Sequence, residues 1–429
     1  MNNEMPKDPR LENLDEEIAE IIFQEFKRNI DLVAIHLRDA RNMLYGVQDD
    51  NNDRALCKAV LLLGAAALES NLVYFSGAAL RISENRTGLF FPGQIRYLRG
   101  IEEVVDENGK LVEKPARQSL SDRLQIVPTL LARTVQRTYQ LKARSAAVQK
   151  LVRTIMRRDA IVHPRADRYI TELGWWEAAE AIDSVELYLD SVRSALHPYL
   201  VGYFPVLYTI PGHDHHEVAV GHRTFGKKGP KRLPTTMGDS GLLEVGIGEW
   251  RDSILLILLA LSHGCEGDSQ GSMFTRAALI VLYAMLDAEL SVMAQWRMAQ
   301  QMDAFREAEV LFLNEWASGV GHDGELSLSE DHQSFKKRIK AIPAILSRCV
   351  EGKELNVDLG RQWGKDLIDG KALRDAVMHS EFDQPLARVS KQELIRSAKA
   401  VFAYFEELVA KSPVTFEYLS VVLKAKPTL

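Results

Sequence analysis

The stretch Arg123-Leu-Gln-Ile-Val-Pro-Thr-Leu-Leu-Ala-Arg133 has a counterpart, Arg338-Ile-Lys-Ala-Ile-Pro-Ala-Ile-Leu-Ser-Arg348, in which the apolar residues and the proline keep their places. Two more pairs of segments match in the same way: Lys58–Glu69 with Arg276–Asp287, and Arg158–His163 with Arg374–His379. The members of the three pairs lie 215, 218 and 216 residues apart. One register therefore relates the two halves of the chain, which indicates a duplicated domain.

The length and the apolar spacing predict an all-α protein of two domains. A chain of 429 residues is longer than one hydrophobic core usually organises. We predict a helical-bundle domain over 1-198, a connector over 199-248 and a second helical-bundle domain over 249-429, packed about a pseudo-two-fold axis. The predicted helices run over about 15–46, 54–80, 119–139, 145–163 and 176–196, then about 249–263, 272–300, 303–317, 330–350, 359–379 and 390–411.

Two segments depart from the helical pattern. Residues 101–114 contain Glu107-Asn-Gly-Lys110 between two Val-containing runs, which predicts a β-hairpin decorating the first domain only. The connector is rich in Gly and Pro and holds the strand-like run Val206–Ile210 and the basic loop Gly226–Arg232, so a small hairpin is open there too.

The composition excludes several classes of protein. The N-terminal segment is polar and acidic, unlike a secretory signal or a transit peptide. No stretch approaches the roughly 20 apolar residues of a membrane span. The cysteines Cys57, Cys265 and Cys349 lie too far apart to indicate a disulfide framework or a thiolate zinc site. These features predict a cytoplasmic protein without a membrane segment.

Basic residues gather in one part of a chain whose net charge is -6. From Arg133 to Arg168 there are ten Lys or Arg against two Asp, a local balance of +8. Such a stretch is typical of a phosphate-binding surface, and a solvated helix face is the alternative. The candidate RNA contacts here and in the connector are Arg153, Arg157, Arg165, Lys227 and Lys228.

The element Arg-Asp-Ala-apolar-apolar-His occurs late in a predicted helix of each half. Its Asp and His are i, i+4 neighbours on one helix face, so the carboxylate can orient the imidazole. Pro164 places His163 at a helix end, where the dipole favours the charged imidazole and titration near neutrality. The Arg and His lie about 140° apart around an ideal helix, so the Arg must curve to share a site. An isolated copy indicates a salt bridge and a capping His, whereas recurrence favours a site.

Both elements resemble the signature of the HEPN domains, short helical bundles in which an Arg, commonly followed by a polar residue, precedes a His. The resemblance covers both helical halves but neither the connector nor the 101–114 insert. It implies that the two domains pair and form one composite cleft that cuts single-stranded RNA without a metal or other cofactor. The implied catalytic residues are Arg158, His163, Arg374 and His379; the implied supporting acids are Asp159, Asp375, Glu69 and Asp287.

The chemistry suits these residue types. One His takes the proton of the ribose 2'-hydroxyl and another gives a proton to the leaving 5'-oxygen, while Arg stabilises the charged phosphorane. The products would carry a 2',3'-cyclic phosphate and a 5'-hydroxyl. The resemblance further implies a toxin or antiviral-defence effector, and it leaves open a homodimer and a regulatory protein partner or antitoxin. The alternative is a non-catalytic scaffold that binds nucleotide, RNA or a protein partner.

Two weaker patterns remain. The histidines 213, 215, 216 and 222 match no zinc spacing of firm structural meaning, and a role in metal or RNA binding is disfavoured. Trp175 and Trp176 begin a helix and could stack on bases, but burial against the bundle is the favoured expectation. No phosphate-binding loop, nucleophile elbow or His-Glu-x-x-His sequence occurs.

Overall fold

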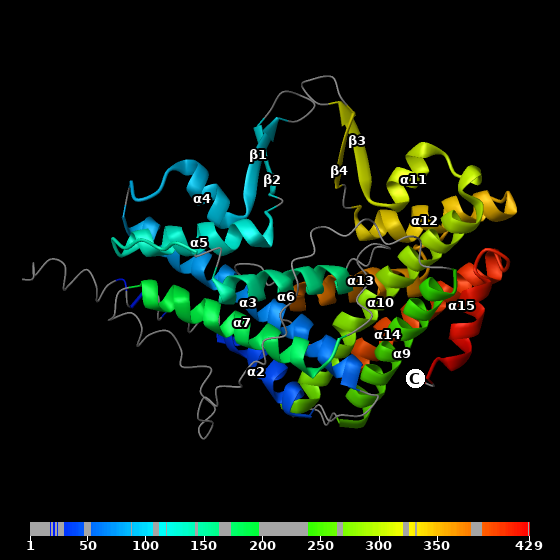
Figure 1. Cartoon of the computed structure of the whole chain (residues 1–429), viewed down its shortest axis with the longest axis horizontal. Helices are drawn as coiled ribbons and strands as arrows, with labels where there is room; N and C mark the ends of the chain where they lie inside the picture. Colours follow the sequence, from blue (N-terminus) through cyan, green and yellow to red (C-terminus); the bar gives the residue numbers. More distant parts are fainter. Residues whose placement is uncertain are drawn as a thin grey trace, which may run out of the picture.

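The computed structural model describes a mostly helical chain (Figure 1). The residues described are 18, 20–21, 24, 30–46, 53–86, 88–105, 111–116, 118–141, 145–162, 173–196, 239–263, 269–320, 326–330, 333–378, 388–427 and 429. The first set of elements is α2 (Ile30–Gly46), α3 (Asp53–Asn85), α4 (Pro92–Arg99), β1 (Ile101–Val105), β2 (Leu111–Pro115), α5 (Leu120–Thr134), α6 (Ala146–Val162) and α7 (Trp175–Ala195).

The second set of elements follows the connector. It consists of α9 (Asp239–His263), α10 (Ser269–Gln301), η1 (Met302–Ala304), α11 (Glu307–Leu313), β3 (Trp316–Val320), β4 (Leu326–Glu330), α12 (Phe335–Glu351), α13 (Gln362–Met378), α14 (Lys391–Lys411), α15 (Glu417–Val422) and η2 (Leu423–Ala425). The elements α3 to α7 and α10 to α14 occur in the same order, and each counterpart begins 215 or 216 residues later.

A β-hairpin is present in both sets, so the expectation of a hairpin in the first half only is wrong. Strands β1 and β2 pair antiparallel with Ile101 opposite Pro115, and β3 and β4 pair antiparallel with Trp316 opposite Glu330. The helix expected over 303–317 is instead η1, α11 and the start of β3. Alternating Leu and Ser in β4 give the period of two that a strand requires. Figure 1 shows both hairpins projecting from the same edge of the helical body.

Capping residues fix several helix starts as their sequences predict. The Ser390 hydroxyl accepts the Glu393 N–H at 3.2 Å, and the Glu393 carboxylate accepts the Ser390 N–H at 2.8 Å, which is the predicted capping box. At α5 the Ser119 hydroxyl accepts the Asp122 N–H at 3.0 Å. These bonds satisfy amide groups that the first helical turn leaves without partners.

The matched prolines lie inside helices, Pro128 in α5 and Pro343 in α12. A proline has no N–H, so the carbonyl four residues earlier loses its helical partner. In both places a tyrosine from the same set replaces that partner: Tyr188 on α7 donates to the Leu124 carbonyl at 2.9 Å, and Tyr404 on α14 donates to the Ile339 carbonyl at 3.0 Å. The proline and the tyrosine therefore form one packing device, which occurs twice.

Replacing Tyr404 with Phe should lower the free energy of unfolding by about 1–3 kcal/mol, because the buried Ile339 carbonyl then has no donor. In a Pro343→Ala background the loss should be smaller, since residue 343 then supplies an amide N–H to the same carbonyl. Denaturant titration of the two single variants and the double variant measures this coupling. Equal losses in both backgrounds would contradict the assignment.

The long apolar helices α3 and α10 form the core. Residues Arg54–Asn85 and Met273–Ala304 are long and apolar enough to cross a membrane by length and composition, which corrects the expectation that no stretch approaches a span. Their most apolar windows are 89% and 94% buried inside the protein, as in the core helices of soluble proteins. Helix α3 contacts α10, and the contacts beside them are reciprocal: α3 touches α13 while α10 touches α6.

Buried ion pairs join the two sets of helices reciprocally. Arg276 on α10 binds Asp39 on α2, and both side chains are almost fully buried. In the opposite sense, Lys58 on α3 binds Glu249 on α9. Arg54 joins the second group, with its guanidinium 3.1 Å from Glu249 and from Asp252. Each set thus supplies a base from its long helix to an acid on the preceding helix of the other.

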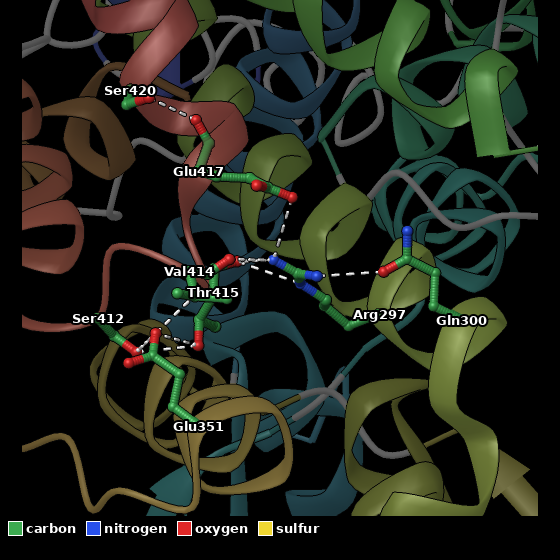
Figure 2. A network of polar contacts seen from close by, with 8 residues as sticks. All are labelled: Arg297, Gln300, Glu351, Ser412, Val414, Thr415, Glu417 and Ser420. Carbon is green, nitrogen blue, oxygen red and sulfur yellow. Dashed lines mark hydrogen bonds and ion pairs between the residues drawn. The ribbon is translucent and has the colours of Figure 1, made fainter.

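A polar network fastens the C-terminal helix α15 (Figure 2). Arg297 on α10 donates to the Thr415 carbonyl at 2.8 Å. The Glu351 carboxylate at the end of α12 accepts the Ser412 hydroxyl at 2.6 Å and the Thr415 N–H at 2.8 Å. Burial alone would raise the pKa of Glu351, but these hydrogen bonds lower it to about 2. The turn after α14 is thereby held against α10 and α12.

Candidate functional site

Arg158, the first residue of the first Arg-x-x-x-x-His element, lies on α6 and faces α3. Its side chain is 11% exposed and donates to the Glu69 carboxylate and to the Asp159 carboxylate, each at 2.8 Å. Burial works against the charged guanidinium, but Glu69 and Asp159 raise the pKa of Arg158. The structure therefore brings together three of the residues implied by the resemblance. His163 lies outside the described residues.

Arg374 on α13 repeats much of this geometry. Its side chain is 5% exposed and donates to the Asp375 carboxylate at 2.9 Å. In both arginines the Nη1 group binds the following Asp, and the buried Nε has no hydrogen-bond partner among the described residues. Burial opposes ionisation of Asp375, but Lys371 and Arg374 bring the pKa of that carboxyl below its usual value. His379 lies outside the described residues.

The two long-helix acids differ in their partners. Asp287 is buried and lies 3.5 Å from the guanidinium of Arg338, which also binds Glu315 at 2.9 Å. Burial raises the pKa of Asp287, while Arg338, Lys371 and Arg374 oppose that rise. Arg374 thus acts on Asp287 electrostatically, whereas Glu69 makes a direct hydrogen bond to Arg158.

The difference traces to one backbone position. Glu315 has a φ of 56°, a left-handed conformation that side chains other than glycine rarely adopt. Its counterpart 215 residues earlier is Gly100, with a φ of 67°. The second set therefore places a carboxylate at a turn where the first has a glycine, and this carboxylate binds Arg338.

The two motif helices also meet the opposite set, because α6 contacts α10 and α13 contacts α3. One side chain belongs to both environments. His36 on α2 is fully buried, and the electrostatics of its ring include Glu69, the partner of Arg158, and the backbone of Val377 near the end of α13. Sequence reasoning missed His36, although its spacing from the buried Ala40 and Met43 places it on the inner face of α2.

The candidate RNA contacts on α6 are engaged with α7. Arg157 lies 2.9 Å from the Glu180 carboxylate, and Arg153 binds the same carboxylate. These arginines turn away from α3 and share one acid, so part of the basic charge is neutralised locally. Arg165, Lys227 and Lys228 lie outside the described residues, as do the histidines 213, 215, 216 and 222.

Trp176 corrects the expectation of burial, because 61% of this residue is exposed. It makes an edge-to-face contact with Trp175, with the ring centroids 5.0 Å apart. The buried stripe of α7 runs through Ala178, Ile182 and Val185, and position 176 lies on the opposite side of the helix.

No group of three or more His, Cys, Asp or Glu side chains that could hold a metal ion occurs among the residues described. The arrangement of buried Arg and Asp groups offers charge stabilisation for an anion rather than ligands for a cation. Comparison with protein-family models, curated proteins and solved structures found no match for this chain.

Proposed function

We propose that the chain is a metal-independent endoribonuclease of the HEPN type that cleaves single-stranded RNA at a composite site. The observation that carries the proposal is the paired geometry of Arg158 and Arg374. Each is buried on a counterpart helix, and each donates through Nη1 to the Asp that follows it. Each motif helix also contacts the long helix of the other set, which supports a site composed from both halves.

The proposal includes a tandem arrangement of two HEPN-like domains, over 1-198 and 249-429. It is supported by the common order and spacing of the elements, and by the proline and tyrosine device found in both sets. The reciprocal ion pairs across α2, α3, α9 and α10 support pseudo-two-fold packing of these domains.

In the proposed mechanism, the carboxylates fix the guanidinium groups before RNA binds. A preorganised cation stabilises developing phosphorane charge more than a mobile one does, because it need not reorganise during the reaction. One motif His removes the 2'-hydroxyl proton, the 2'-oxygen bonds to phosphorus, and the 5'-oxygen leaves with a proton from the other His. Asp159 and Asp375 hold the arginines.

The biological setting of the proposal is a cytoplasmic toxin or antiviral-defence effector. Its partners would be single-stranded RNA and, by the same resemblance, a regulatory protein or antitoxin, with a homodimer as a further arrangement. A non-catalytic scaffold that binds nucleotide, RNA or protein is the second candidate. It is favoured by the extent of burial of Arg158 and Arg374, which limits direct access to a substrate.

The test is incubation of the purified chain in EDTA with labelled single-stranded RNA, followed by analysis of the fragment ends. We expect 2',3'-cyclic phosphate ends from the wild type, and a rate about 10²–10⁴-fold lower after His163→Ala or His379→Ala, since each removes one proton-transfer group. His263→Ala, outside both elements, is the matched control. Cleavage by the His163→Ala/His379→Ala protein would refute the site, and RNA binding without cleavage would support the scaffold.

A further inference from the structure

His36 is a buried polar side chain without a structural partner of its own. It is 0% exposed, and neither ring nitrogen makes a hydrogen bond among the described residues. Burial and the nearby Arg276 lower the pKa of His36 to about 3, against smaller opposing effects of the Val377 backbone and Glu69. The ring is therefore neutral at physiological pH, with one N–H donor and one acceptor nitrogen.

The surroundings of His36 come from both sets of helices. Glu69 on α3 holds the Arg158 guanidinium at 2.8 Å, so one neighbour belongs to the first motif. Val377 belongs to the last turn of α13, three residues after Arg374, so another neighbour belongs to the second motif. Arg276 on α10 anchors α2 through Asp39, three residues after His36.

The end of α13 has polar groups that need a partner from elsewhere. The last four carbonyls of an α-helix, here those of residues 375–378, have no intrahelical donor. The Val377 backbone faces the neutral ring closely enough to affect its pKa, although the geometry falls short of a hydrogen bond. A small movement of the last turn would let the His36 N–H donate to the Val377 carbonyl.

We propose that His36 is a positioning residue that holds the last turn of α13 in register with the Glu69–Arg158 pair of the other set. This role rests on the proposed composite site. A buried imidazole with unpaired nitrogens costs about 1–3 kcal/mol relative to satisfied groups, and an apolar side chain would avoid that cost. The arrangement instead keeps a polar group at the point where the two motif helices depend on each other.

The test compares His36→Leu, which fills similar space without polar atoms, with His36→Asn, which keeps one donor and one acceptor group near the same place. Hydrogen exchange followed by mass spectrometry should show faster exchange in His36→Leu at the peptide covering 374–378. The peptide covering 158–162, at the end of α6, serves as the internal reference. His36→Asn should restore the slow exchange of the first peptide, at least in part.

The same variants are assayed with RNA. In His36→Leu we expect kcat to fall about 10–100-fold while KM and the melting temperature stay near wild-type values, because displacement by about 1 Å is enough to impair reacting groups. His36→Asn should regain much of kcat. A kcat loss that Asn does not rescue, or a fall in melting temperature that accounts for it, would overturn the positioning role.

The two readouts separate this inference from the ribonuclease proposal. If the wild type cuts no RNA, local exchange at 374–378 still decides the role of His36 in holding α13. Unchanged exchange there, or equal acceleration at both peptides, would overturn that role whatever the RNA assay shows. If His36→Leu fails to fold, His36→Asn with His263→Asn as its control is compared with the wild type: slow exchange and retained kcat support the inference, and a local loss of protection contradicts it.

Discussion

Replacing Arg276 with methionine is expected to lower the free energy of unfolding by about 3–5 kcal/mol. The substitution removes the guanidinium that binds Asp39 and leaves that carboxylate buried between α2 and α10. An uncompensated charge in the interior loses its hydration without an opposite charge to replace it. Denaturant titration monitored by far-ultraviolet circular dichroism measures the loss.

The matched double variant, Arg276→Met/Asp39→Leu, removes both charges. Its stability should return close to that of the wild type or exceed it, since well-packed apolar residues often replace a buried ion pair without loss. Arg361→Met is the control for an exposed pair. Arg361 lies 3.0 Å from Glu407 with its side chain 53% exposed, so its removal should cost less than about 1 kcal/mol. Equal losses in Arg276→Met and Arg361→Met would contradict the interpretation.

The Glu289→Gln variant is expected to gain stability relative to the wild type as the pH rises from about 5 to about 9. Glu289 on α10 is fully buried beside Tyr418, and its carboxylate oxygens have no hydrogen-bond partner among the described residues. Burial, with a contribution from Glu249, raises the pKa of Glu289 to about 8. The folded protein therefore keeps a proton that the unfolded chain releases near the ordinary pKa of glutamate.

The sign follows from proton linkage. Below about pH 4 both states hold the proton, and the wild type carries no penalty. Between the unfolded and the folded pKa the unfolded state binds fewer protons, so wild-type stability falls as the pH rises, by on the order of 4 kcal/mol in all. The Gln side chain does not titrate, which removes this dependence. Parallel stability curves for Glu289→Gln and the wild type would contradict the prediction. Glu244→Gln, on the exposed face of α9, is the control.

Much of the helical fold could be predicted because its signals are local. The period of apolar residues and the Ser390–Glu393 capping box locate α14, and the Asn-Gly dipeptide locates the turn between β1 and β2. The second hairpin was missed although Asp323-Gly324 lies between its strands. The run Trp316–Val320 holds a Gly and two small residues, so its strand pattern is weak without the partner strand.

The candidate site could be predicted only in part. Recurrence in the sequence was enough to single out Arg158 and Arg374, and the acid at 69 proved to be a direct partner of Arg158. The partner of Asp287 could not be predicted in the same way, because Arg338 reaches it only through the left-handed turn at Glu315. His36 carries no motif, and its meaning depends on packing between residues more than 300 positions apart.

The reciprocal ion pairs have a consequence for how the protein folds. Asp39 in the first set is compensated only when α10 is in place, and Lys58 requires α9. Unfolding either set would leave buried charges of the other without their counterparts. The folding free energy therefore belongs to the pair, and the two sets of helices form a single cooperative unit.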